Sequence, residues 1–527
     1  MNTMNPSLSF KRRALWSAAA LALCGTLASC GGGDDGGSAG GGGGGTGSKA
    51  GEDPIAVNTS LAIAPMVAKS TVKAQEVAAQ PVLGADAPVA QITLPALAAT
   101  KAALPAPQKG QAMRIGTVRA TGAQAGADEV AKLLQWQLLP GGGQAAALRF
   151  ASTGAAGVRL AVDVQSLPEG AVLRFYGDEG EVQAVPAAEA ARLRAINEKA
   201  GLEGEAARTV WSLPFDGERA TLEVELPAGV APDAVALAVP QLSHQMLTVQ
   251  QALEKDASDI GSSGSCNLNA TCVYDDINAE SRAVAKMIFN AIDPDDGRLK
   301  SYLCTGTLLN DANSSGTPYF ITANHCISTQ GAAASLTTYW FFRAASCGSP
   351  NRADGGMKVL GGGAEGLITS PAYDDTDPAN PYYGYDATLL KLNNPPPAGA
   401  VYAGSYWGSL GTGDGTLGVH HPGGDLQKYS VGNVTGYTAC KSSSDGGSGC
   451  ARNGDSTYPL YRIGWKRGTT EGGSSGSALF VRDQATGTRY LAGVLHGGNA
   501  SCSNQGGFDA YGRFDGFFPA VQPWLQP

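Results

Sequence analysis

The sequence predicts an all-β protein in which a small β-sandwich precedes a double β-barrel. From residue 266 onward, short apolar runs alternate with Gly, Pro, Asn and Asp, which is typical of a barrel or sandwich built from many short strands. Upstream, apolar and polar residues alternate with period two, as in half-buried antiparallel strands. Residues 266–527 are enough for two barrels of about six strands each.

Length, composition and charge limit the class of protein. The chain has 527 residues, of which 43% are apolar, so it is too long for one hydrophobic core and must form several structural units. Its formal net charge is −9, and the only basic cluster is at residues 11–13, which argues against nucleic acid as a partner. The sequence has no C-x-x-C pair, and we expect neither a metal ion nor a cofactor.

An export signal is predicted at the N-terminus. Basic residues 11–13 precede apolar residues 14–28, a stretch too short to span a bilayer but of the length of a signal-peptide core. The Leu-Ala-Ser-Cys motif ending at Cys30 resembles a bacterial lipobox, whose cysteine is lipidated after cleavage, whereas Cys24 follows a bulky leucine. We expect residues 1–30 to be a lipoprotein signal peptide, with an ordinary signal peptide as the alternative.

Residues 31–109 are expected to carry little packed structure. A Gly-rich run at residues 31–45 would act as a flexible tether that holds a folded body away from a membrane surface. The stretch from residue 50 to about 108 is rich in Ala, Pro and Val with few aromatic residues, which favours an extended or partly disordered lead-in.

Residues 110–247 form the predicted sandwich. One helix, at residues 187–200, lies between a proline and a glycine, which are typical start and stop signals. The unit has no cysteine and a single histidine, His244, which we interpret as a structural or surface residue rather than a catalytic one. Residues 248–265 then read as a connector. The clearest strand patterns are residues 158–164, 172–176 and 221–226.

Eight cysteines lie in the C-terminal half of the chain. An even number in an exported protein indicates a disulfide framework rather than a metal site, although about a hundred pairings are formally possible. The eight are Cys266, Cys272, Cys304, Cys326, Cys347, Cys440, Cys450 and Cys502.

The stretch Thr-Glu-Gly-Gly-Ser-Ser-Gly-Ser, residues 470–477, precedes an apolar run at residues 478–481. A small-residue turn that exposes one serine before a strand suits a nucleophile, because backbone N–H groups can converge beside its hydroxyl. We interpret Ser475 as that nucleophile. The alternative is a flexible linker, since the chain contains 73 glycines and such composition usually marks a turn or loop.

A serine nucleophile requires a base and a carboxylate that orients the base. His325 ends an apolar strand pattern in Thr-Ala-Asn-His-Cys, which resembles the Thr-Ala-x-His-Cys motif of chymotrypsin-like serine proteases. Asp386 leads another apolar strand pattern. Taken singly, the two residues could be a structural histidine and a strand-capping acid. The order His325, Asp386, Ser475 is nevertheless the chymotrypsin order.

The region from residue 264 to about 525 resembles the bacterial lysyl endopeptidases, a family with the chymotrypsin-like fold. The resemblance implies that His325 is the general base, that Asp386 orients it, and that Ser475 forms the acyl-enzyme. It also implies an oxyanion hole formed by the N–H groups of Gly473 and Ser475, with each donor contributing on the order of 3 kcal/mol. The matching segments are residues 264–267, 303–308, 419–422, 470–477, 495–498 and 509–513.

The same resemblance assigns a specificity pocket. Asp509 matches the family's aspartate at the base of the pocket, where a lysine or arginine side chain would neutralise it; a surface turn is the alternative. His496 matches a histidine near the pocket, and Gly497 and Gly498 should leave a strand edge open to the substrate backbone. Residues 437–454 offer no clear counterpart of the family's tryptophan, so arginine is kept beside lysine as a substrate residue.

The resemblance further implies three disulfides and leaves one cysteine pair over. Each closed loop could contribute roughly 2–4 kcal/mol of stability. His420 and His421 are expected to be structural. The expected pairs are Cys266–Cys502, Cys272–Cys347 and Cys304–Cys326, with Cys440–Cys450 as an extra local bridge.

Activation is expected to differ from that of digestive trypsins. Ser474 stands where those enzymes carry an aspartate that pairs with a new N-terminus, and a serine cannot form that ion pair. We hypothesise instead that the β-rich unit is a propeptide, which restrains the protease until the chain cuts itself after a basic residue. Lys255 is the candidate nearest to the cysteine-bearing region.

The sequence therefore predicts a serine endopeptidase that cleaves after basic residues. It would be an exported bacterial lipoprotein of the outer membrane or cell surface, with a protease domain that can be released. Its partners would be basic-residue substrates, its own propeptide and a lipid anchor. The alternatives are a lipid-anchored binding or adhesion protein that keeps the protease fold without turnover, and a protease of narrower specificity.

Overall fold

The structure is a computed structural model. Its described residues belong to one compact unit, Gly47–Pro527. Cys30 and Lys255 lie outside the described residues, so the predictions made for them stay predictions. The described ranges are 49–68, 80–84, 86–98, 103–178, 182–247, 263–353, 356–372, 384–442, 448–450 and 454–527.

The N-terminal part is a β-sandwich, as predicted. Its core lies between two sheets and contains Phe150, Leu160 and Phe175, all with no exposed surface. One sheet has the order β3 (Ala90–Leu94), β6 (Gln144–Ser152), β12 (Arg219–Leu226), β8 (Val172–Tyr176), β9 (Gln183–Pro186), with β5 (Gln137–Leu138) beside β6. The facing strands are β10 (Thr209–Trp211), β7 (Gly157–Ser166), β13 (Ala236–Gln245), β4 (Met113–Ala120) and β11 (Phe215–Asp216).

The predicted helix is also present. Helix α3 (Ala187–Lys199) begins after Pro186 and ends before Gly201, whose φ of 89° is in the left-handed region that favours glycine. Its short neighbours in this part of the chain are α2 (Ala127–Leu133), α4 (Gly204–Arg208) and the 3-10 turns η2 (Ala123–Ala125) and η3 (Pro232–Ala234).

The C-terminal part contains two β-barrels. The first follows the order β18 (Thr337–Trp340), β15 (Val284–Ile292), β16 (Leu299–Leu309), β17 (Tyr319–Thr322), β21 (Tyr385–Leu392), β20 (Ala364–Ala372), with β19 (Lys358–Leu360) beside β18. The second follows β30 (Arg489–Gly498), β29 (Ala478–Arg482), β24 (Gly415–His420), β25 (Lys428–Thr438), β28 (Leu460–Arg467), β31 (Asp509–Arg513), and it closes because β31 also pairs with β30. This is the predicted all-β, chymotrypsin-like double barrel.

Shorter elements complete the barrels. They are β14 (Leu268–Asn269), β22 (Val401–Tyr402), β23 (Gly404–Tyr406), β26 (Cys440–Ser442), β27 (Ser448–Cys450), α5 (Asn278–Ala283), α6 (Gln330–Ala334), α7 (Phe514–Leu525), η5 (Ala270–Val273) and η6 (Pro422–Gly424).

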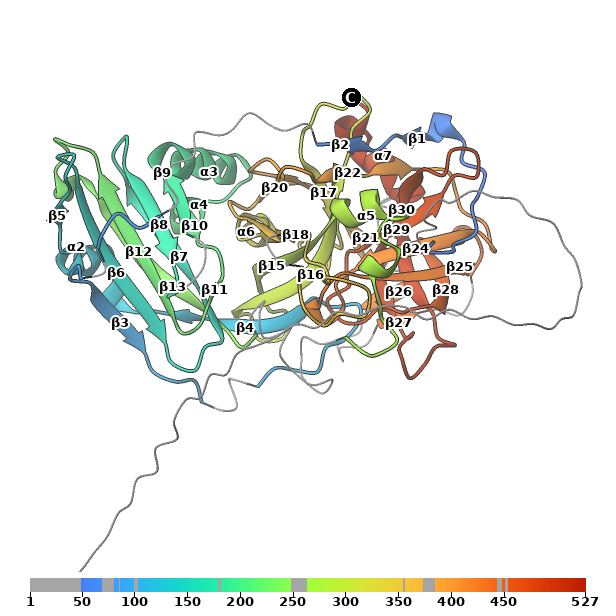
Figure 1. The fold of residues 1–527 in the computed structure, drawn as a ribbon, viewed down its shortest axis with the longest axis horizontal. Helices are drawn as coiled ribbons and strands as arrows, with labels where there is room; N and C mark the ends of the chain where they lie inside the picture. Colours follow the sequence, from blue (N-terminus) through green and yellow to red (C-terminus); the bar gives the residue numbers. More distant parts are fainter. Residues whose placement is uncertain are drawn as a thin grey trace, which may run out of the picture. The chain divides into compact units, whose positions relative to one another are not determined.

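One strand joins the sandwich to the first barrel. Strand β4 pairs antiparallel with β13 on one side and with β16 on the other, which makes a single twelve-stranded sheet (Figure 1). The alternation of residues 158–164 predicts a half-buried strand, but β7 is buried on both faces over most of its length. Arg159, on its outer face, is fully buried and donates to the carbonyl of Ser335 in the barrel region.

The expectation of a low-order lead-in is wrong for residues 49–68 and 90–94. Strand β1 (Ala62–Ile63) pairs with β23, β2 (Met66–Val67) pairs with β22, and η1 (Thr59–Leu61) precedes them. Glu52 is buried and accepts a bond of 2.6 Å from Arg489. Strands β1 and β2 gain order from partners more than 300 positions away, and β3 gains it from β6 of the sandwich; local composition cannot reveal such pairings.

The four disulfide pairings are as expected: Cys266–Cys502, Cys272–Cys347, Cys304–Cys326 and Cys440–Cys450. The first bridge spans 236 residues and the last only 10. The Cys304–Cys326 bridge joins β16 to the residue after His325, so it helps to fix the position of that histidine.

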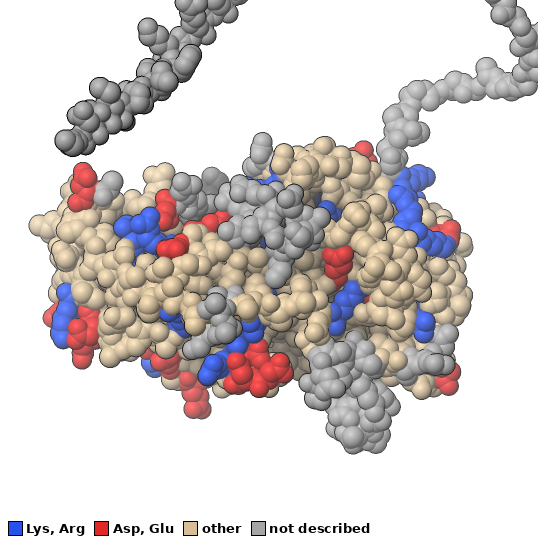
Figure 2. Space-filling view, turned by 90° about the horizontal axis from the view of Figure 1, so that it is seen from below, with Lys and Arg blue, Asp and Glu red and all other residues tan. Residues whose placement is uncertain are grey.

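Charged side chains form small mixed groups on the face seen in Figure 2, with no extended basic area. That distribution agrees with the sequence, in which basic clusters are confined to residues 11–13. Among the residues that the structure describes, no helix is both long enough and apolar enough to cross a lipid bilayer.

Candidate active site

The turn that carries Ser475 lies between β28 and β29 and depends on two glycines. Gly473 and Gly476 have φ of 89° and 83°, a region that side chains disfavour. A β-carbon added to Gly476 would lie 2.2 Å from Oγ1 of Thr322. The Gly-Gly-Ser-Ser-Gly sequence is therefore required by a strained and crowded turn, and the linker interpretation is excluded.

The buried His420 contacts this turn through its imidazole. Nδ1 of His420 lies 2.9 Å from Oγ of Ser474, and its Nε2 lies 3.0 Å from Oγ of Ser430. Burial holds the pKa of His420 well below its ordinary value, so the ring is neutral. Burial likewise lowers the pKa of His421 to about 3. Both histidines have the expected structural role, and His420 supports the turn where trypsins use an ion pair.

Two N–H groups beside Ser475 are available to an anion. Thr305 ties down the carbonyl side of the turn, because its N–H donates to the carbonyl of Ser475 over 2.9 Å and its hydroxyl donates to the carbonyl of Gly473 over 3.0 Å. Within the described part of the chain, the N–H groups of Gly473 and Ser475 have no acceptor. Fixed donors of this kind can stabilise a developing oxyanion.

His325 and Asp386 make the contacts expected of a base and its orienting acid. Oδ1 of Asp386 accepts the backbone N–H of His325 over 2.9 Å, and Oδ2 lies 2.6 Å from Nδ1 of the ring. Asp386 is fully buried. Burial alone would raise the pKa of its carboxyl, but His325 and His496 outweigh burial and the pKa is lowered. The carboxylate thus fixes the ring with Nε2 turned away from it.

Ser475 and His325 come from different barrels, and β16 brings them together. Thr305 bonds to Ser475 and follows Cys304, whose disulfide partner is the residue after His325. Within the described residues, Nε2 of His325 has no hydrogen-bond partner. The Ser475 hydroxyl instead donates to the carbonyl of Gln111 over 3.4 Å.

His496 contacts Asp386, the acid that also contacts His325. Its Nδ1 lies 2.6 Å from Oδ2 of Asp386, and its ring meets the His325 ring edge to face at 5.8 Å. The side chain is 1% exposed. Oδ2 of Asp386 thus contacts two imidazoles at once, and the substrate-binding role expected of His496 stays a prediction.

Asp509 is the first residue of β31 and is completely buried. Its Oδ2 accepts bonds of 2.7 Å from the indole of Trp465 and from the hydroxyl of Thr470. Its Oδ1 lies 2.7 Å from Nζ of Lys109, which also donates to the carbonyl of Ala500 over 2.6 Å. A buried carboxylate of this kind is stable only with a cation or donors around it, so the surface-turn interpretation of Asp509 is excluded.

The strand edge at Gly497 and Gly498 is close to another part of the chain. A β-carbon added to Gly497 would lie 2.4 Å from the backbone nitrogen of Gly110. Only glycine permits this close approach of a backbone, and substrate pairing at this edge stays a prediction. In this structure the edge is covered by Lys109 and Gly110 and is not open.

Comparisons with known proteins match almost the whole folded region. A lysyl endopeptidase N-terminal domain model matches residues 87–246, and a lysyl endopeptidase C-terminal domain model matches residues 260–512. The lysyl endopeptidase of Pseudomonas aeruginosa is 32% identical over 450 residues, which cover 82% of this chain and 86% of that protein. This chain belongs to the lysyl endopeptidase family.

Two solved structures are more distant. The MamO protease domain from Magnetospirillum magneticum is 13% identical and has a TM-score of 0.28, over 46% of this chain and 98% of its own. The HtrA-type protease AlgW with tripeptide is 17% identical and has a TM-score of 0.27, over 48% and 62%. Scores this low carry no argument. The family membership identifies the chain as a serine endopeptidase.

Four residues around Asp509 have roles that the sequence does not indicate: Lys109, Trp465, Thr470 and Ala500. Thr470 lies in the recognised turn, but nothing there marks its hydroxyl as a ligand of Asp509. Trp465 reads as an ordinary aromatic residue of a barrel strand. Its register in β28, two residues after Ile463, which pairs with Asp509 of β31, could have indicated that it lies near Asp509.

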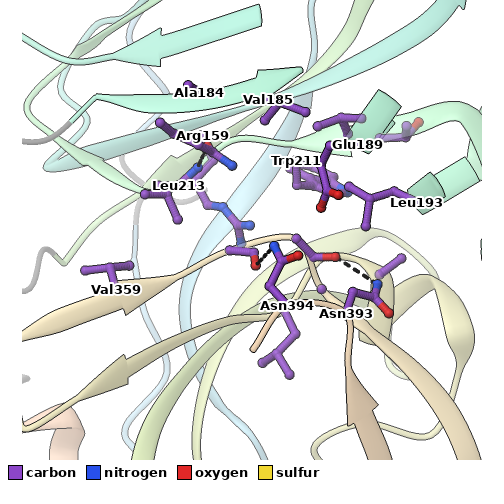
Figure 3. Close-up of a pocket in the computed structure, with 18 of the residues that line it drawn as sticks. Arg159, Ala184, Val185, Glu189, Leu193, Trp211, Leu213, Val359, Asn393 and Asn394 are labelled. Carbon is purple, nitrogen blue, oxygen red and sulfur yellow. Dashed lines mark hydrogen bonds between the residues drawn. The ribbon is translucent and has the colours of Figure 1, made fainter. Parts of the chain in front are cut away.

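A separate cavity of about 240 Å³ lies between the sandwich and the first barrel (Figure 3). Arg159 and Trp211 line it from the sandwich, and Val359, Asn393 and Asn394 line it from the barrel. None of the residues that line it belongs to the site of this lysyl endopeptidase family member. The cavity shows that the two parts are incompletely packed here.

Proposed function

We propose that this serine endopeptidase cleaves peptide bonds on the carboxyl side of lysine. The observation that carries the proposal is the buried carboxylate of Asp509 with a lysine ammonium 2.7 Å from its Oδ1. A pocket built around an unpaired carboxylate binds a cationic side chain and rejects an uncharged one, because the acid would otherwise stay buried without a partner.

The surroundings of Asp509 favour lysine over arginine. Trp465 and Thr470 both donate to Oδ2, so only Oδ1 remains for a substrate. A guanidinium gains most from two parallel bonds to both oxygens of a carboxylate. A compact ammonium needs only one carboxylate oxygen. The Lys109 ammonium donates its second hydrogen bond to the carbonyl of Ala500 over 2.6 Å.

The proposed mechanism uses the triad and the turn. His325 takes the proton of the Ser475 hydroxyl as the oxygen attacks the carbonyl after lysine, and Asp386 stabilises the imidazolium. The N–H groups of Gly473 and Ser475 bind the oxyanion. His325 then protonates the leaving amine, and water hydrolyses the acyl-enzyme by the same route.

Asp509→Asn tests the pocket. Loss of a buried charge partner costs about 3–5 kcal/mol, so kcat/KM for lysyl peptides should fall by roughly 150- to 5,000-fold, while hydrolysis of peptides with neutral residues at that position stays low or rises. The measurement is a peptide library that varies the residue before the cleaved bond. Asp455→Asn, at an exposed turn, is the matched control. Retained lysine preference in Asp509→Asn would refute the pocket assignment.

The proposal extends to export and maturation. The protein would be an exported bacterial lipoprotein of the outer membrane or cell surface, lipidated at Cys30, made with residues 110–247 as a propeptide and cut at Lys255. The support is the signal-like N-terminus, the lipobox-like motif and the basic residue before the protease domain.

Intact-mass measurement of the protein from its own membrane and medium checks this. We expect a mature N-terminus at Asp256 in the active protein and no such cut in Ser475→Ala. A mature N-terminus far from residue 256, or the same processing in the serine variant, would overturn self-cleavage. Cys30→Ala should remove lipid from the precursor, whereas a lipidated variant would contradict the anchor.

A further inference from the structure

Residues 107–111 run across the candidate active site. A β-carbon added to Gly472 would lie 2.7 Å from Cβ of Pro107, and one added to Gly497 would lie 2.4 Å from the nitrogen of Gly110. Between these two points, the Lys109 side chain enters the pocket of Asp509. This segment, which we call the strap, therefore touches the nucleophile turn, the strand edge and the pocket together.

The strap fills the pocket as a substrate would. The Lys109 side chain is only 10% exposed, and that of Asp509 is not exposed at all. Its ammonium uses the one carboxylate oxygen that Trp465 and Thr470 leave free. A peptide substrate cannot place its own lysine there until Lys109 leaves.

The strap does not present the lysine for cleavage. For attack after a lysine, the carbonyl carbon of that same lysine must face the nucleophile. The oxygen that accepts the Ser475 hydroxyl belongs to Gln111, over 3.4 Å, two residues after Lys109. Pocket and nucleophile are thus occupied by different residues of the strap, and the bond after Lys109 is out of register.

The register is fixed by the strand that follows. Met113, the first residue of β4, pairs with Leu303, and Arg114 pairs with Tyr302, both in β16. The other edge of β4 pairs with β13 of the sandwich. Sliding the strap by two residues would keep each side chain on its face of the sheet, but it would move β4 two positions out of register, so its pairs with β13 and β16 would have to break.

We propose that the strap is a built-in, uncleaved inhibitor of the protease, with Lys109 as its anchor. The inference rests on the proposed lysine pocket. Cleavage of the connector would then leave the sandwich bound to the protease, because Lys109 and the β4–β16 ladder keep the strap in the site. Full activity then requires that the N-terminal part dissociate or be destroyed.

The test compares the full chain with Lys109→Ala and Lys109→Met, the second of which keeps an aliphatic stem. Hydrolysis of a short lysyl amide should be about 100-fold faster in both variants than in the unaltered protein, given the strength of a buried charge pair. Lys132→Ala, which alters an exposed lysine of α2, is the matched control and should not change the rate. Thermal unfolding of each variant confirms that it is folded.

Mass spectrometry of the same samples decides between inhibitor and substrate. We expect the bond between Lys109 and Gly110 to stay intact in the unaltered protein, whereas a fragment that ends at Lys109 would overturn the proposal. Equal rates in all variants would also overturn it, and would leave the lysine specificity standing. If instead the variants hydrolyse only peptides without lysine faster, the proposed lysine specificity is wrong and the inhibitory role of the strap is supported.

Discussion

Replacing Ser475 by alanine is expected to lower kcat by about 10⁶-fold, to the level left by binding and the oxyanion donors alone. The hydroxyl is the only part of the residue lost, and the turn is held by Gly473, Gly476 and the His420–Ser474 bond. Folding should therefore be unchanged. The measurement is hydrolysis of a lysyl amide at saturating concentration, with thermal unfolding of the same preparation.

The matched control is Ser503→Ala, which removes an exposed hydroxyl from the same barrel and should keep full activity. A labelling experiment with a small fluorophosphonate adds an independent readout, because only the Ser475 hydroxyl should react. Activity that survives in Ser475→Ala at more than about one part in a thousand would rule out the covalent mechanism.

The change Asp386→Asn should lower kcat by about 10⁴-fold, because an amide lets the histidine ring take the wrong tautomer. Here the effect has a second source. Oδ2 of Asp386 contacts both His325 and His496 at 2.6 Å. If the asparagine amide nitrogen took this position, it would donate and could accept from neither ring; if its oxygen took it, the nitrogen would face the backbone N–H of His325. We expect both imidazoles to lose their orientation.

The pH profile separates this effect from simple misfolding. His325 and His496 lower the pKa of the Asp386 carboxyl, so the native protein keeps it ionised at every working pH. The stability that this carboxylate contributes is present above its unfolded pKa of about 4 and is lost only as the pH falls further, through its native value. The defect of Asp386→Asn should thus persist from about pH 5 to 9.

Asp293→Asn is the control for burial, since Asp293 is a buried acid of the same barrel that accepts from Tyr302 over 2.9 Å. It should lower the melting temperature without lowering kcat. If Asp386→Asn changed only the melting temperature, the orienting role of the acid would be wrong.

Short local motifs indicate His325, Asp386 and Ser475 as candidates, whereas the disulfide pairings follow from the family resemblance, because spacing alone leaves about a hundred pairings open. His325 stands in the motif Thr-Ala-Asn-His-Cys at the end of a strand pattern. Ser475 lies in a turn whose positive φ angles favour glycine at positions 473 and 476. The barrels were likewise predictable, since their strands are short, apolar and separated by turn residues.

The remaining site residues depend on distant partners. Lys109 stands in a stretch whose composition indicates low order, and its meaning comes from Asp509, 400 positions away. The contact between His496 and Asp386, which lies 110 residues earlier, likewise has no local signal. Residues 49–68 are ordered by short ladders on strands β22 and β23. Single-sequence periodicity has no signal for such pairings.

The strand that joins sandwich and barrel also bears on how the protease acquires its fold. Strand β4 is synthesised first and later covers one edge of β16, so it can act as a template on which the first barrel assembles. Met113 and Leu303 are far apart in the chain, so this pairing is itself one of the non-local contacts that slow folding. If residues 87–246 are removed after folding, β16 loses the strand that covers this edge, and we expect the remaining protease to persist because it unfolds slowly rather than because it refolds.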